Sequence, residues 1–210
     1  SAGCALRSDA LLFGLPSPTL DAALPRSVCN VAGDREVLLE GSGFVEAQGQ
    51  APTVLLNGEA VETLGLEDCE AVDFEGAALQ TCRGLRIRVP QGRFPEGELE
   101  VELRNPEPAD CSARRNDLLA VVPQPVVSQA EPQDLCSVEG AQLTVRGQSF
   151  TPLSTVSLGD ALAGEVEYVD AQTLVVTFFG LEALTPGPYD LVVPNGDGCE
   201  DRLDAGIQLH

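Results

Sequence analysis

The sequence predicts an all-β protein made of two tandem β-sandwich domains. The same series of strand-like blocks occurs twice, apolar and polar residues alternate within the blocks, and turn-forming residues separate them. The 210 residues include 21 Gly and 15 Pro, a content that favours many short strands over long helices. A chain of this length can hold two domains, each with its own hydrophobic core.

Five blocks recur in the same order, and this internal repeat predicts two homologous domains, residues 11–123 and 124–210. A cysteine followed four residues later by glycine comes first, at Cys29 and Cys136, and a G-x-x-F block then ends at Phe44 and Phe150. The remaining pairs are TVLLNG (53–58) with TVSLGD (155–160), LRIRVP (85–90) with LVVTFF (174–179), and GELEVELRN (97–105) with GPYDLVVPN (187–195).

The periodicity inside the blocks is that of strands with one buried face. ELEVEL at 98–103 alternates acidic and aliphatic residues, and LRIRV at 85–89 alternates aliphatic residues with arginine. No segment has a sustained helical period. We further predict an N-terminal tether over residues 1–10, an insertion near 66–82 in the first domain, and a short, semi-rigid connector at 121–127.

The seven cysteines predict a disulfide framework and therefore an oxidising compartment. Each domain has one cysteine before its first core strand and one after its last, which predicts the intradomain bridges Cys29–Cys111 and Cys136–Cys199. Two cysteines of the insertion predict a third bridge, Cys69–Cys82. Zinc is disfavoured, because closely spaced cysteine pairs are lacking and the single histidine is His210.

Cys4 has no partner in this scheme. The preceding Ser1-Ala2-Gly3 resembles the lipobox of bacterial lipoproteins, in which small residues precede an acylated cysteine. Three fates remain open for Cys4: a lipid anchor, a bridge to another chain or domain, or a free thiol. The lack of Met fits a chain whose export signal has been removed, or one cut from a longer protein.

The composition disfavours several classes of function. The net charge is −21 and all 12 cationic residues are arginines, so nucleic acid and anionic membrane surfaces are poor partners. No apolar run is long enough to insert into a membrane. The only histidine is terminal, there is no lysine, and no phosphate-binding glycine loop occurs, so we predict a chain that is not an enzyme.

Two ligand hypotheses follow from local sequence. Asp197, Glu200 and Asp201 surround a glycine-rich turn and could bind calcium, although the same sequence is a good turn without metal. Phe74 lies in the insertion and has no counterpart in the core, so it either contacts a partner or is buried locally. Glycan binding is disfavoured by the lack of Trp and by the core positions that the repeat predicts for Tyr189, Phe44 and Phe150.

The repeated pattern resembles IPT/TIG domains, immunoglobulin-like modules of transcription factors, plexin-type receptors and bacterial surface proteins. The second repeat carries most of the family's marks, while the first has Leu99 where the family has tyrosine. The marks are Pro132, Gly147, Phe150, Thr155, Val156, Gly187, Tyr189, Asp190, Val192, Val193 and Asn195. The resemblance implies two tandem immunoglobulin-like (IPT/TIG-type) β-sandwiches.

The function expected from these features is that of a non-enzymatic scaffold. It would be a rigid two-domain structural or interaction module of the bacterial cell surface, periplasm or outer membrane, or of a secreted assembly. Its partners would be other envelope or extracellular proteins. The alternative is a ligand-binding surface protein or lipoprotein that recognises calcium or a glycan.

Overall fold

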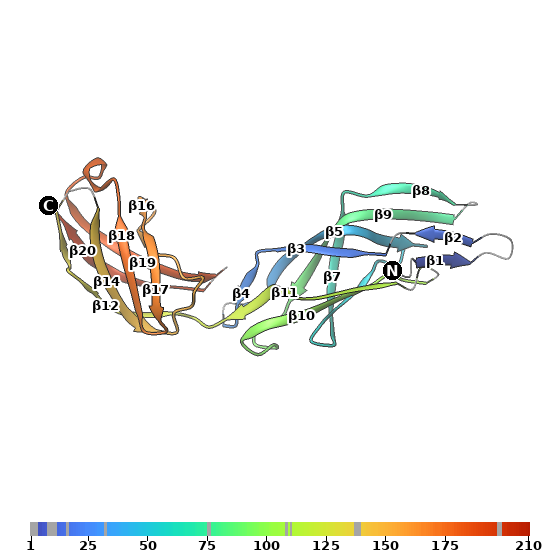
Figure 1. The fold of residues 1–210 in the computed structure, drawn as a ribbon, viewed down its shortest axis with the longest axis horizontal. Helices are drawn as coiled ribbons and strands as arrows, with labels where there is room; N and C mark the ends of the chain where they lie inside the picture. Colours follow the sequence, from blue (N-terminus) through green and yellow to red (C-terminus); the bar gives the residue numbers. More distant parts are fainter. Residues whose placement is uncertain are drawn as a thin grey trace. The chain divides into compact units, whose positions relative to one another are not determined.

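The computed structural model (Figure 1) describes residues 4–7, 12–15, 17–31, 33–74, 77–107, 109, 111–136, 140–196 and 199–210. The side chains of 4–7, 12–15, 73–74 and 77–78 are outside this description. By their internal contacts the residues form two compact units. The first unit comprises Ser1–Ser27 and Gly33–Val121, and the second comprises Val28–Ala32 and Val122–His210.

The first unit begins with an antiparallel hairpin of β1 (Cys4–Arg7) and β2 (Leu12–Leu15). β1 lies inside the segment 1–10 predicted as a tether, and β2 follows it. The remaining strands follow the hydrogen-bonded order β3-β5-β9-β7-β6-β10-β11-β4, with β8 added to β9. They are β3 (Thr19–Leu24), β4 (Ser27–Cys29), β5 (Arg35–Ala47), β6 (Thr53–Leu56), β7 (Glu59–Glu67), β8 (Glu70–Phe74), β9 (Ala77–Val89), β10 (Gly97–Arg104) and β11 (Ser112–Val122). The ends of β4 and β11, at residues 28–29 and at Val122, belong to the second unit.

The second unit has two separate sheets, with strand orders β12-β14-β18-β17 and β13-β20-β19-β15-β16 (Figure 1). The only helix among its described residues is the short 3-10 helix η1 (Leu181–Ala183). The strands are β12 (Val126–Glu131), β13 (Asp134–Leu135), β14 (Ala141–Gln148), β15 (Ser157–Leu158), β16 (Leu162–Ala163), β17 (Glu165–Asp170), β18 (Thr173–Phe178), β19 (Gly187–Gly196) and β20 (Cys199–Leu209).

The two units share one strand plan, and the repeated blocks fall on equivalent strands. The order β3-β5-β9-β7 corresponds to β12-β14-β18-β17, and β4-β11-β10-β6 corresponds to β13-β20-β19-β15. Hydrogen bonds match as well: Ala120 N donates to Arg26 O (3.0 Å) and Gln208 N donates to Gln133 O (2.7 Å). A four-stranded sheet facing a sheet that holds the last two strands is the immunoglobulin-like arrangement.

A two-residue turn makes the first unit differ from the second. Asn57 and Gly58 both have positive φ (50° and 83°), the conformation of a tight type I′ hairpin turn. This turn pairs β6 with β7, and β7 also pairs with β9. The two sheets of the first unit are therefore joined along this side, whereas β15 and β17 of the second unit lie in separate sheets.

Alternating aliphatic residues fill both interiors, as the sequence predicted. Phe44 and Phe150 are buried, which confirms their predicted core positions. Each phenylalanine packs against the glycine three residues earlier, because a Cβ at Gly41 or Gly147 would collide with that ring and with a backbone carbonyl of β3 or β12. The second core consists of Val127, Ala130, Leu135, Leu143, Val145, Phe150, Val156, Leu158, Leu174, Val176, Phe178, Leu181, Leu191, Val193, Ile207 and Leu209.

Tyr189 occupies the start of β19 and is half-buried against this core. Its hydroxyl donates to Thr185 O at 2.9 Å, four residues upstream. This is the tyrosine corner of immunoglobulin-like domains, in which a tyrosine near the start of the penultimate strand fixes the preceding turn. Leu99 takes the equivalent place in the first unit and is fully buried.

A buried asparagine closes the penultimate strand of each unit. Asn105 donates to Gly43 O (2.8 Å) and accepts from Val45 N (3.0 Å). Asn195 donates to the equivalent carbonyl, Ser149 O (2.6 Å), and to Pro123 O (2.9 Å). These amides satisfy backbone groups that would otherwise be buried without partners. Asn105 thereby fixes the irregular part of β5, and Asn195 fixes the segment that follows β14.

We expect Asn195→Ala to lower the free energy of unfolding by about 2–3 kcal/mol, since two carbonyls lose their donor in a buried site. Asn105→Ala should have a similar effect in the first unit. Equilibrium denaturation in urea measures both changes. Asn116→Ala, at an exposed position of β11, is the matched control, and an Asn195 variant no less stable than this control would contradict the assigned role.

Candidate functional site

Four of the described cysteines form the bridges Cys29–Cys199 and Cys69–Cys82. The Cys69–Cys82 bridge confirms the prediction for the insertion, where it joins the β7–β8 turn to β9. The predicted Cys29–Cys111 and Cys136–Cys199 bridges are wrong. Cys111 is disulfide-bonded to a residue other than Cys29, and Cys136 is an exposed free thiol.

The direction of one strand explains why these predictions failed. β13 runs parallel to β20 and pairs Leu135 with Leu209, so Cys136 follows at the end of β20 that carries His210. Cys199 opens β20, ten residues earlier. At about 3.3 Å per residue, this separates the two cysteines by roughly 30 Å. Cys136 and Cys199 are close in sequence to the first and last strands of the unit, but they are far apart in space.

Cys29 belongs instead to the second unit, together with the whole segment Val28–Ala32. Cys29, Val122 and Cys199 form a small buried cluster. Asn30 N donates to Val122 O at 3.1 Å, and Cys199 Sγ lies 3.5 Å from the same oxygen. The second unit is therefore assembled from two stretches of sequence, and a fragment that starts at residue 124 lacks both Cys29 and Val122.

The strand β17 forms an edge of the second unit. It pairs with β18 on one side, and no strand of the described residues pairs with its other side. Glu165, Glu167 and Asp170 are exposed along it, and Tyr168 and Val169 are 38% and 52% exposed. A hollow of about 200 Å³ on the adjoining sheet face is lined in part by Glu165 and Glu167.

The two units have similar net charges, but their arginines are distributed unequally. Ten of the 12 arginines fall in the first unit, where there are 20 acids. The second unit has two arginines, Arg146 and Arg202, against 13 acids. Arg202 forms an ion pair with Asp190 (3.3 Å). The β17 edge thus lies in a unit with a large excess of negative charge, which attracts cations and cationic segments.

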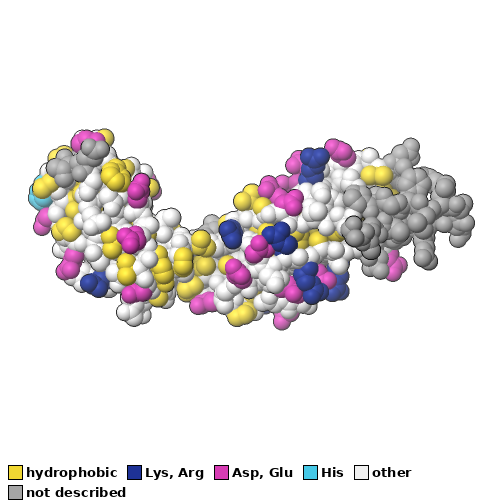
Figure 2. Space-filling model, in the orientation of Figure 1, with side chains coloured by type: hydrophobic (Ala, Val, Ile, Leu, Met, Phe, Trp, Pro, Cys, Tyr) yellow, Lys and Arg dark blue, Asp and Glu magenta, His cyan; other side chains and the backbone are white. Residues whose placement is uncertain are grey.

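Among the described residues, six arginines of the first unit form ion pairs with acids, some within one strand and others between neighbouring strands or from the loop before β10. The ion pairs are Arg86–Glu67, Arg88–Glu62, Arg93–Glu59, Arg104–Glu102, Arg114–Glu100, Arg114–Glu102 and Arg115–Asp117. Acidic and arginine side chains lie interspersed on the face shown in Figure 2. These arginines stabilise strand pairing rather than forming a basic patch.

Glu102 is the buried member of this network, with a side chain only 7% exposed. Arg104 Nε donates to its Oε1 at 2.8 Å and Arg114 Nη2 donates to its Oε2 at 2.9 Å. The hydrogen bond from Arg104 is the main reason that the pKa of Glu102 is held below its ordinary value of 4.5, since it outweighs the opposite effect of burial. Glu102 therefore remains ionised although it is buried.

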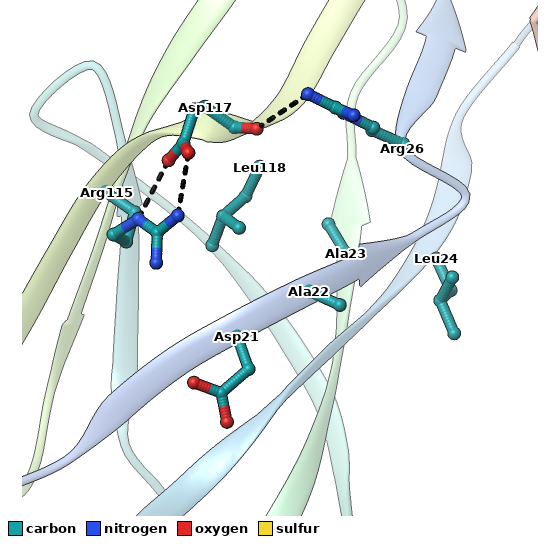
Figure 3. A pocket seen from close by; sticks show the side chains of 8 residues that line it. All are labelled: Asp21, Ala22, Ala23, Leu24, Arg26, Arg115, Asp117 and Leu118. Atoms are coloured by element: carbon teal, nitrogen blue, oxygen red, sulfur yellow. Dashed lines mark hydrogen bonds and ion pairs between the residues drawn. The ribbon is translucent and has the colours of Figure 1, made fainter.

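A hollow of about 330 Å³ lies between β3 and β11 of the first unit (Figure 3). Arg115 donates to both carboxylate oxygens of Asp117 (2.8 and 2.7 Å) and to Leu20 O on β3 (3.2 Å). The Arg115 guanidinium lowers the pKa of Asp117. Arg26 donates to Asp117 O at 3.3 Å. The charged groups around this hollow therefore connect the edge strand β3 to β11.

The residues proposed for calcium are not assembled into a metal site in the described part of the chain. Asp201 Oδ2 accepts a hydrogen bond from Val127 N (2.7 Å), and Glu200 is exposed. Asp197 lies outside the described residues. No group of three or more His, Cys, Asp or Glu side chains is placed to hold a metal among the residues that are described.

Two further predicted sites involve side chains outside the described set. Cys4 is in β1 and Phe74 ends β8, but only their backbones are described. The exposed aromatic side chains that sequence analysis missed are Tyr168 and Phe179, at 38% and 47% exposure. They lie at opposite ends of β18, because Tyr168 pairs with Leu174 and Phe179 follows Phe178.

None of the helices found in the described residues is both long enough and apolar enough to span a membrane. No protein-family model matches the chain, and no curated protein matches it. Similar solved structures include the extracellular region of plexin A4, with 13% identity and a TM-score of 0.42 over 85% of this chain and 14% of that one.

Other similar structures are SGBP-B from a complex xyloglucan utilization locus in Bacteroides uniformis and the I9–I11 tandem of titin. SGBP-B has 17% identity and a TM-score of 0.34 over 92% of this chain and 50% of that one. The titin tandem has 13% identity and a TM-score of 0.30, with coverages of 95% and 67%. This chain spans half or less of plexin A4 and SGBP-B. The immunoglobulin-like description of the chain rests on its own strand order.

We expect Glu102→Gln to lower the free energy of unfolding by about 1 kcal/mol near neutral pH, where its ionised form is paired with two half-exposed arginines. The depressed pKa means that the carboxylate stabilises the folded state above pH 4.5. This contribution is lost as the pH falls through the folded-state value, so the variant and the parent should converge in acid. Denaturation at several pH values measures this.

Glu98→Gln removes the same charge from an exposed position of β10 and serves as the control. A difference between Glu102→Gln and the parent that stays constant from neutral to acidic pH would contradict the assigned ion pairs.

We expect Cys29→Ser to expose Cys199 to alkylation and to destabilise the second unit by about 5 kcal/mol in the chain-entropy model for a loop of 170 residues. Thermal unfolding and thiol labelling under non-reducing conditions report both effects. Cys136→Ser, which removes a thiol that is not bonded, should change neither. Equal melting temperatures for the two variants would mean that the Cys29–Cys199 bridge does not stabilise the unit.

Proposed function

We propose that this chain is a non-enzymatic structural and interaction module that works outside the cytoplasm, in a bacterial cell surface, envelope or extracellular assembly. Two features support this proposal. Disulfides are typical of proteins in oxidising compartments, which supports a location outside the cytoplasm. The shared strand plan, the repeated G-x-x-F and asparagine positions, and Tyr189 of the second unit support units of the IPT/TIG type.

The observation that carries the proposal is the unpaired side of β17. An edge strand offers a row of backbone N–H and C=O groups with which an extended segment of another protein can pair. The corresponding strand of the first unit, β7, pairs with β6 through the Asn57-Gly58 turn. Among the described strands, β17 of the second unit therefore has an unpaired side, whereas the equivalent strand of the first unit, β7, is paired on both sides.

The partner segment is defined by charge. Glu165 and Glu167 lie on the outer face of the edge and Asp170 at its end, in a unit with only two arginines. Acidic residues along an edge repel a second copy of the same strand, which protects against self-association. They attract an extended segment that has Lys or Arg at alternate positions. The partner of this edge is therefore a basic β-strand of another protein.

Glycan binding is the alternative that exposed aromatic side chains favour. Phe179, 47% exposed after the end of β18, is available to stack on a sugar ring. Loss of glycan-array binding in Phe179→Ala, with β17 variants unaffected, would select this alternative.

A peptide in which lysine and valine alternate tests the β17 proposal. Titrated into the full chain labelled with ¹⁵N, it should shift the amide resonances of β17 most, and the affinity should fall with added salt because exposed charges are screened. Glu165→Arg combined with Glu167→Arg should abolish the shifts.

The matched control is Glu182→Arg, an exposed acid of the same unit that lies in η1. The proposal fails if the double variant binds the lysine peptide as well as this control does, or if a peptide of alternating glutamate and valine shifts the same resonances equally.

A further inference from the structure

Cys136 corresponds to Cys29 in the repeat. Cys29 ends β4 and Cys136 follows β13, the equivalent strand of the second unit. Backbone hydrogen bonds place β4 beside β11 and β13 beside β20 in the same register, as Ala120 N to Arg26 O and Gln208 N to Gln133 O show. Val122 and His210, the residues that end or follow β11 and β20, are likewise equivalent.

The two equivalent cysteines differ in their bonding. Cys29 is 3% exposed and is bonded to Cys199, the cysteine that opens the last strand of the second unit. Cys136 is exposed and free. Leu135 beside it is buried, and His210 N donates to Leu135 O at 2.9 Å, so the backbone that presents Cys136 is formed.

Strand direction determines which partner either cysteine can reach. Within one unit, the cysteine after the short parallel strand and the cysteine that opens the last strand lie at opposite ends of that last strand, roughly 30 Å apart. A bridge between these two kinds of cysteine therefore joins residues of successive repeats. Cys29 of the first repeat and Cys199 of the second follow this rule.

We propose that Cys136 forms the same bridge one repeat later. Its partner is the cysteine that opens the last strand of a further immunoglobulin-like unit of this repeat, placed after the second unit. This choice of partner is based on the Cys29–Cys199 bond. That bond joins the cysteine after the short parallel strand of one repeat to the cysteine that opens the last strand of the next repeat. The inference concerns residues remote in sequence from β17 and stands independently of the edge-strand proposal.

The bond forms by thiol–disulfide exchange with an oxidant that is itself a disulfide. The Cys136 thiolate attacks one sulfur of the oxidant, which releases one thiol and leaves a mixed disulfide. The incoming cysteine thiolate then attacks the Cys136 sulfur and releases the second thiol. Two electrons pass from the two cysteines to the oxidant, and the two protons end on the released thiols.

An extended chain provides the test: residues 1–210 followed directly by a second copy of residues 123–210. His210 corresponds to Val122, so the junction reproduces the passage from the first repeat to the second. After oxidation with glutathione disulfide, non-reducing peptide mapping should link host Cys136 to Cys199 of the added copy. Alkylation of host Cys136 should fall from complete in the parent chain to the background of bonded cysteines.

Two control variants isolate the bond. Cys136→Ser in the host should leave Cys199 of the added copy open to alkylation, and Cys199→Ser in the added copy should leave host Cys136 open. A folded extended chain with an intact Cys29–Cys199 bond in which host Cys136 still alkylates fully would overturn the proposal. So would a Cys136–Cys136 dimer of the parent chain formed in preference to the bridge.

A second measurement does not depend on folding of the extended chain. A synthetic peptide of residues 187–209 contains Cys199 as its sole cysteine. In glutathione disulfide it should couple to Cys136 of the parent chain several-fold faster than a peptide of the same composition in scrambled order. Equal rates for the two peptides would count against the proposed recognition.

Discussion

The parallel pairing of the short strand β13 with β20 is the constraint on which the covalent structure depends. An immunoglobulin-like sandwich divides its first strand between two sheets, and the second part runs beside the last strand in the same direction. The residue after that short strand therefore lies at the far end of the last strand, away from the turn that precedes it. Cysteines at these two positions cannot close one unit, but they can link successive repeats.

Within this common plan, small local differences give the two units different surfaces. Asn57 and Gly58 adopt the left-handed conformations of a tight hairpin, and their turn joins the sheets of the first unit. The second unit has Gly159 and Asp160 in the equivalent block, followed by the two-residue strand β16 before β17. Its sheets stay separate on that side, and β17 remains an edge.

Much of the fold could be predicted from sequence, because the signals are local and repeated. Alternation in ELEVEL and LRIRV predicted strands whose aliphatic residues are buried, and the G-x-x-F blocks predicted Phe44 and Phe150 in the core. The cysteine pairing could not be obtained in the same way. It depends on strand direction and on the placement of Val28–Ala32 in the second unit. Neither can be recognised from the spacing of the cysteines in the sequence. Knowledge that the first and last strands pair in parallel would have corrected it.

The two units differ in how far their acidic side chains are paired with arginines. The net charge of −21 does not reveal this difference. In the first unit most arginines form an ion pair with a nearby acid. The buried Glu102 forms ion pairs with both Arg104 and Arg114. In the second unit, Val192 and Pro194 stand where Glu102 and Arg104 stand in the first, and 13 acids face two arginines. Excess charge in that unit therefore cannot be satisfied by strand pairing within it. A solvated acidic surface keeps such a unit soluble. Beside the edge strand β17, the same surface favours the addition of a strand that carries cationic side chains over one that does not.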